Sequence, residues 1–398
     1  MFDHDPDPAL GPGPDGPDFE RLLEEAYGSD EHAKAAARAD ITAMSDHQAV
    51  DATSAHETIA GLVWRTLRDL GIRGGRMLVI GQDAEVFAGL PAGERRLPPG
   101  DANGFTAAIP DAVAREGHPH AGLPLRLFDD DAPDEYDVVI AVPPHLDVSL
   151  HRPGVTTARR VAQTLMILGC LEHTEPGGYL VALASREVLD DPDIQGRMLI
   201  AERGELVGAL RLPAGSLRPG LPGNDACVDL LILRRPLVPS SPITPCQFLP
   251  VWPLHMGDQV VQVNQYWLAN PQHVLGILAT RPNPWGKPEV TVHANPEHRL
   301  HTSLARGLDD VLGHAHTTGL TAETGATIDA RLRDAQRHDP NTPIPYTLVD
   351  RHDLDAVRQQ IAQIRAERRR ENLNPAKPSP EPPPRARKPS NENPGPSL

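Results

Sequence analysis

Apolar positions in this chain fall into short runs with few charges, at residues 77–80, 138–142, 179–183, 206–212 and 226–233. Runs of this kind are typical of strands that are buried on both faces of a parallel sheet. Stretches with helical spacing lie between or beside them, at residues 54–70, 155–171 and 187–203. The alternation predicts an α/β fold with a doubly wound, mostly parallel sheet. The last two strands follow each other without a helix, so we expect an antiparallel pair at the edge.

Composition divides the chain into four predicted parts. Residues 1–50 are interpreted as an acidic disordered tail with a short helix around residues 19–27, because residues 1–31 hold ten acids and one base. Residues 51–236 form the predicted α/β domain, and residues 237–350 an accessory region. Residues 351–398 are predicted to be a polar helix followed by a basic disordered tail, with eight bases and nine prolines in residues 365–398.

Charge and cysteine content narrow the functional classes. The formal net charge of −16 disfavours a protein that simply coats nucleic acid. Three widely spaced cysteines indicate a reducing compartment without a disulfide framework or zinc cluster. Two His-x-His pairs, at 118–120 and 314–316, lack a third convergent ligand, so no metal site is predicted. With no signal peptide and no apolar run of membrane-spanning length, we expect a cytoplasmic protein that does not contact a membrane.

One stretch is the natural candidate for a site. The run 138–142 ends abruptly at Pro143-Pro144, which cannot donate hydrogen bonds to a sheet. Ligands of open α/β sheets bind beyond the carboxyl ends of the strands, so this turn is a candidate wall of an active site. The alternative is a core strand followed by an ordinary turn.

Several segments match one family in order and content: 74–79, 87–91, 137–140, 176–186, 206–213, 228–235 and 263–276. Together these segments, within residues 54–312, resemble the adenine-specific, amino-type DNA methyltransferases. The resemblance is closest to the methylase modules of methylase–helicase fusion proteins from phages and conjugative elements. Type I restriction–modification subunits are more distant relatives.

The resemblance implies a class I methyltransferase fold, S-adenosylmethionine as cofactor, and double-stranded DNA and a helicase as possible partners. Such enzymes flip an adenine out of the duplex and methylate its exocyclic amine. The family uses a glycine-rich loop after the first strand to hold the cofactor. It uses an Asn-x-Pro-Phe type motif to bind the target amine and stack on the base.

This sequence departs from both motifs. The catalytic motif is replaced by a degenerate set, Val142, Pro143, Pro144 and His145. Valine cannot accept a hydrogen bond from an amine, and loss of such a group costs transition-state stabilisation. The cofactor loop is represented by Gly81, Asp83 and Glu85, with one glycine out of place. Asp101 and Asp129 are the candidates for the ribose-binding acid that normally ends the second strand.

Three interpretations remain open. In the first, the chain is a degenerate methyltransferase that acts as a binding or interaction module and takes no cofactor. In the second, it is an active S-adenosylmethionine-dependent adenine methyltransferase with a non-standard site. In the third, it is an unrelated α/β nucleotide-binding enzyme such as a dehydrogenase, which the missing Gly-x-Gly-x-x-Gly disfavours. We favour the first, because both motifs depart independently.

Overall fold

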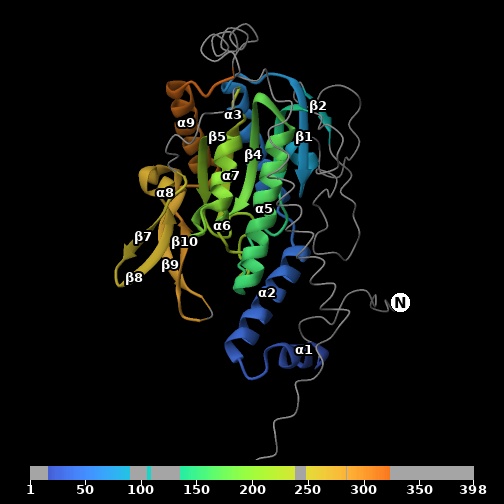
Figure 1. Ribbon diagram of the computed structural model, residues 1–398, viewed down its shortest axis with the longest axis vertical. Coiled ribbons are helices and arrows are strands. Elements are labelled where there is room, and N and C mark those ends of the chain that lie inside the picture. The colour runs from blue at the N-terminus through green and yellow to red at the C-terminus, as the bar shows by residue number, and fades with distance from the viewer. Residues whose placement is uncertain (1–16, 90–104, 109–134, 238–247, 284, 323–398) are drawn as a thin grey trace, which may run out of the picture. The chain divides into compact units, whose positions relative to one another are not determined.

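The computed structural model describes residues 17–89, 105–108, 135–237, 248–283 and 285–322 (Figure 1). The strands of its main sheet are β1 (Gly75–Gly81), β2 (Phe105–Ala108), β3 (Tyr136–Val142), β4 (Thr174–Ser185), β5 (Glu205–Leu212) and β6 (Val228–Arg234). The helices around it are α3 (Thr53–Asp69), α4 (Ala84–Phe87), α5 (Pro153–His173), α6 (Glu187–Asp190), α7 (Gln195–Arg203) and α9 (Leu300–Thr318).

The sheet has the order β2-β1-β3-β4-β6-β5. Neighbours from β2 to β4 pair in parallel, whereas β6 runs antiparallel to both β4 and β5. The predicted doubly wound, mostly parallel sheet is therefore confirmed, as is the antiparallel pairing of its last two strands. Sequence analysis missed β2, whose four residues lie in a part of the sequence that is rich in Gly, Pro and Asp.

Helices cover both faces of the sheet because alternate residues of each strand point in opposite directions. On one face, Met77, Val79 and Ile140 belong to a core shared with α3 and α9. On the other, Leu78 and Val139 join a core shared with α5, α6 and α7. In Figure 1, α5 and α7 lie on the viewer's side of the strands.

The predicted boundary at residue 236 does not separate two structural parts. After it come the hairpins β7 (Val251–Met256)–β8 (Gln259–Asn264) and β9 (Gly276–Pro282)–β10 (Pro288–Ala294), with α8 (Gln265–Ala269) and a 3-10 turn, η1 (Pro271–His273), between them. The following helix, α9, buries Leu304, Leu308 and Val311 against the sheet. Much of the expected accessory region thus belongs to the same core. The predicted polar helix and basic tail lie outside the described residues.

The short helix expected around residues 19–27 is present, but the prediction of a disordered tail up to residue 50 is wrong for the rest of residues 17–49. This segment forms α1 (Pro17–Tyr27) and α2 (Glu31–Ala49). Small apolar residues explain the difference: Ala36, Ala37 and Ala43 are fully buried, and Phe19 packs with Leu23 and Ala37. The acidic composition concealed a helix whose buried face is built mainly from alanine.

Candidate functional site

The carboxyl edge of the sheet brings the two predicted motifs together. Strands β1 and β3 are neighbours, and their register places Gly81 directly beside Val142. The backbone N–H of Gln82 donates to the carbonyl oxygen of Val142 over 2.8 Å. Residues 61 positions apart in the sequence are thus joined at the edge where α/β folds bind ligands.

The loop after β3 offers little to an incoming amine. The side chain of Val142 is fully buried and apolar, and its carbonyl oxygen already accepts a hydrogen bond. Pro143 is buried and Pro144 half-buried. The carbonyl oxygen of His145 accepts from Nη1 of Arg159 over 3.2 Å. The carbonyl oxygens of Val142 and His145 are therefore engaged inside the protein.

The loop after β1 is shaped by the neighbouring strand. Gly81 has a φ of 106°, and a Cβ built on it would lie 2.0 Å from the carbonyl oxygen of Val142. The glycine is required by this contact between two strands. In dinucleotide folds, by contrast, glycines of such a loop let a ligand approach the backbone.

The acidic residues of the same loop are also accounted for. Asp83 adopts left-handed backbone geometry with a φ of 50°, and its carboxylate lies 2.7 Å from Nδ1 of the buried His56 in α3. Glu85 is half-buried in the first turn of α4. The residues that resemblance assigns to S-adenosylmethionine therefore do not form a glycine cradle for it, and they do not fit this cofactor in the arrangement seen.

A buried polar cluster next to the loop was not predicted. His47, in α2, lies with Nδ1 3.2 Å from Oδ1 of Asn224 and 3.3 Å from Oδ1 of Asp147. Its Nε2 accepts the backbone N–H of His145 over 3.3 Å. Nη1 of Arg218 donates to both carboxylate oxygens of Asp147, over 2.7 and 2.8 Å. The one sequence signal for this cluster was the helical spacing of Asp40 and His47 among alanines.

Burial and neighbouring charges set the protonation of this cluster. Burial lowers the pKa of His145 to about 4, and the nearby His47, Arg159 and Arg218 act in the same direction. Burial would raise the pKa of Asp147, but hydrogen bonds and charge from His47 and Arg218 outweigh it and lower the pKa. At neutral pH the cluster thus holds a neutral His145 beside an ionised Asp147.

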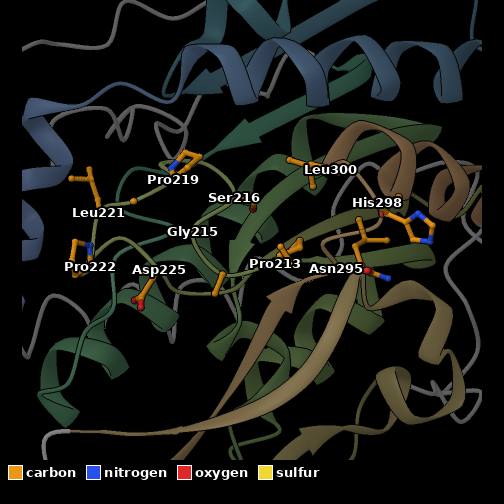
Figure 2. Close-up of a pocket in the computed structure, with 15 residues that line it drawn as sticks. Pro213, Gly215, Ser216, Pro219, Leu221, Pro222, Asp225, Asn295, His298 and Leu300 are labelled. Carbon is orange, nitrogen blue, oxygen red and sulfur yellow. The ribbon is translucent and has the colours of Figure 1, made fainter.

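A cavity of 540 Å³ lies further along the same edge, beyond the end of β5 (Figure 2). Prolines and leucines form much of its wall, including Pro213, Leu275 and Leu300, and Asn295 adds a polar group. Its carboxylate, Asp225, pairs with Arg281 over 2.5 Å. The lining suits a neutral ligand and includes none of the predicted site residues.

Among the residues that the structure describes, no group of three or more His, Cys, Asp or Glu side chains could hold a metal ion. His314 and His316 both lie on α9, and His118 and His120 fall outside the described residues. Asp101 and Asp129 also fall outside them. In the described part of the chain, no helix combines the length and apolarity needed to cross a membrane.

No protein-family model matches the sequence, and no curated protein matches it significantly. Among solved structures, the chain is similar to a protein described as a class I S-adenosylmethionine-dependent methyltransferase from Listeria monocytogenes. The two share 16% identity over 57% of this chain and 73% of that one, with a TM-score of 0.30.

Two further solved structures have comparable scores. The N-methyltransferase NodS from Bradyrhizobium japonicum, in complex with S-adenosyl-l-homocysteine, is 14% identical over 56% of this chain and 95% of its own, with a TM-score of 0.25. A type I restriction–modification methyltransferase subunit from Streptococcus thermophilus is 11% identical over 45% of this chain and 43% of its own, with a TM-score of 0.26. At such scores the similarity does not by itself establish a shared activity.

Proposed function

We propose that this chain is a DNA methyltransferase-like protein whose two reaction loops are degenerate, and that it acts as a DNA-binding or interaction module. The sequence segments that resemble adenine-specific methyltransferases support the origin. The strand order, with one antiparallel strand in a parallel sheet, supports it too. Fold descent does not confer activity, so the state of the loops decides between an enzyme and a module.

One observation carries the proposal. At the position where the family binds the target amine, Val142 presents a buried apolar side chain and a carbonyl oxygen that accepts from Gln82. A methyltransferase needs acceptors there that are free to meet the amine in the transition state. To free this carbonyl, the bond between the ends of β1 and β3 would have to break.

The geometry of the cofactor loop supports the same conclusion. The space in front of Gly81 is filled by the Val142 carbonyl, and Asp83 is paired with His56. Groups of both loops are thus engaged in contacts within the protein. Partners remain part of the proposal: double-stranded DNA, and a helicase or another protein.

Two titrations of the full chain test the proposal. We expect calorimetry with S-adenosylmethionine to show no saturation up to about 1 mM, corresponding to a binding free energy weaker than about −4 kcal/mol. Fluorescence anisotropy with a short adenine-containing duplex should show binding that weakens as salt rises. Saturable micromolar binding of S-adenosylmethionine would contradict degeneracy, and absence of duplex binding at low salt would contradict the DNA-binding role.

A further inference from the structure

We propose that the surface beneath α2 binds the phosphate backbone of a nucleic acid, and that α2 covers this surface in the unliganded chain. The inference rests on the proposed DNA-binding function and adds its location and its regulation. It follows from the contacts that α2 makes and from the charges that these contacts neutralise.

The first anchor of α2 is an acid held by donors that would suit a phosphate. Asp40 is fully buried. Its Oδ1 accepts the backbone N–H of His151 over 2.7 Å, and its Oδ2 accepts Nε of Arg152 over 2.8 Å and the N–H of Arg152 over 3.3 Å. Guanidinium and backbone N–H groups together are the donors that proteins use for phosphate oxygens.

The second anchor lies two turns further along the helix. His47 contacts Asn224, Asp147 and the backbone of His145. The side chain of Asn224 donates to the carbonyl oxygen of Ala43 over 3.1 Å. These contacts reach the two loops at 145–152 and 218–224 and not the strands of the sheet.

The apolar part of this interface is small. Ala43 is buried with Val148 and Leu150, and Met44 and Val155 pack at its border. Buried charges and hydrogen bonds contribute less net stability than apolar burial of similar extent, because each group gives up water to form them. An interface of this composition can open without disturbing the two large cores of the domain.

The charges explain what opening would expose. Arg159 pairs with Glu187 and Arg218 with Asp147, so both cations keep their partners without α2. Arg152 pairs with Asp40 of α2 and donates to Tyr27 of α1, so both of its partners lie on the two N-terminal helices. Departure of α1 and α2 therefore leaves Arg152 as a cation without a described acidic partner.

The exposed surface would also include two histidines and would lie at the ligand-binding edge. His145 and His151 lie on the same loop as Arg152, and this loop directly follows β3. A polyanion that competes with Asp40 for Arg152 would displace α1 and α2. Asp40 thus acts as an internal substitute for a backbone phosphate.

The test compares Asp40→Asn with Asp46→Asn in the full chain. Both variants remove one negative charge from α2, but no described ion pair involves Asp46. Hydrogen–deuterium exchange of residues 145–149, whose N–H groups do not bond to Asp40, reports opening without any ligand, and anisotropy with a short DNA duplex reports binding. We expect Asp40→Asn to accelerate exchange at least about tenfold and to tighten duplex binding about tenfold relative to Asp46→Asn. Adding Arg152→Ala to Asp40→Asn should abolish the gain in affinity.

The outcomes separate this inference from the function on which it rests. Unchanged exchange in Asp40→Asn would show that α2 is a fixed part of the fold, which overturns the inference. Faster exchange with duplex binding equal to that of Asp46→Asn overturns it too, while the DNA-binding function stands. Absence of duplex binding in every variant, including the wild type, overturns both. Faster exchange with tighter, Arg152-dependent binding supports both.

Discussion

The imidazole of His47 in α2 lies against the imidazole of His145 after β3, with ring centroids 4.5 Å apart. Nε2 of His47 accepts the N–H of His145 over 3.3 Å, so His47 carries its proton on Nδ1 in this arrangement. Helix α2, which composition assigned to a tail, thus determines the environment of the loop after β3. This loop occupies the position of the catalytic motif in the methyltransferases that the sequence resembles.

The burial of His145, together with this contact, predicts a loss of stability in acid. The pKa of His145 is about 4 in the fold and about 6.5 in an unfolded chain, so the unfolded state binds the proton first as pH falls. The neutral ring is favourable above pH of about 6.5, and its contribution is lost progressively towards pH of about 4. A shift of this size corresponds to at most about 3 kcal/mol, less because the ring is partly solvent-accessible.

Denaturant unfolding at pH values of about 7.5 and 4.5 checks this prediction. His145→Asn is the suitable variant, because asparagine tolerates the left-handed φ of 58° at this position. We expect the variant to lose about 1 to 3 kcal/mol less between the two pH values than the wild type. An identical pH dependence in the two proteins would show that His145 does not titrate as inferred.

The contact between Gly81 and Val142 predicts a large cost for a single methyl group. Gly81→Ala adds a Cβ 2.0 Å from the Val142 carbonyl oxygen at a φ of 106°. Gly220 has a φ of 85° but open space around it, so Gly220→Ala isolates the backbone strain. We expect about 1 kcal/mol of destabilisation for Gly220→Ala and at least about 3 kcal/mol for Gly81→Ala, measured by urea unfolding. Equal costs would mean that the strand ends separate easily.

The buried pair of Asp147 and Arg218 should be expensive to break. Both side chains are 1% exposed. Asp147→Asn leaves the guanidinium without its charge partner, and we expect a loss of about 3 to 5 kcal/mol in the free energy of unfolding. The surface pair of Arg65 and Asp309 provides the control, since Asp309→Asn should cost at most about 1 kcal/mol. A similar cost for both variants would contradict the structural importance of the cluster.

Sequence patterns predicted the sheet because its strands are buried on both faces and read as apolar runs. They also placed Val142 and Gly81 at one edge, because the carboxyl ends of parallel strands meet there. They could not predict that Arg211 and Asp229, which interrupt two of these runs, pair inside the sheet over 2.8 Å. The two charges are 18 positions apart in sequence, and only the antiparallel register brings them opposite each other.

Helix α2 was missed for a different reason. Asp40 and His47 belong to a segment that was interpreted as a disordered acidic tail, whereas each is buried with a partner more than 90 positions away. Long-range polar contacts leave no periodic signal beyond the helical spacing itself. Composition therefore gave the wrong answer for residues 28–49, although it described the charge of the N-terminal segment correctly.

The basic residues at 365–398 predict a separate contribution to DNA binding. Removing them should weaken binding to a short duplex and reduce the salt dependence, because each Lys or Arg that neutralises a phosphate adds to the slope. Anisotropy titrations at several salt concentrations, with and without these residues, measure both effects. Equal affinity at low salt would assign the binding to residues 1–364 alone.

The central claim is that both reaction loops are degenerate, and transfer of labelled methyl groups from S-adenosylmethionine to adenine-containing DNA tests it most directly. The assay compares the wild type with Val142→Asn, which restores the side chain that the family uses. We predict no transfer above background by either protein, because the cofactor loop is also altered. Transfer by the variant alone would show that the loop at Gly81 still holds the cofactor. Robust transfer by the wild type would contradict the account and identify an active methyltransferase with a non-standard site.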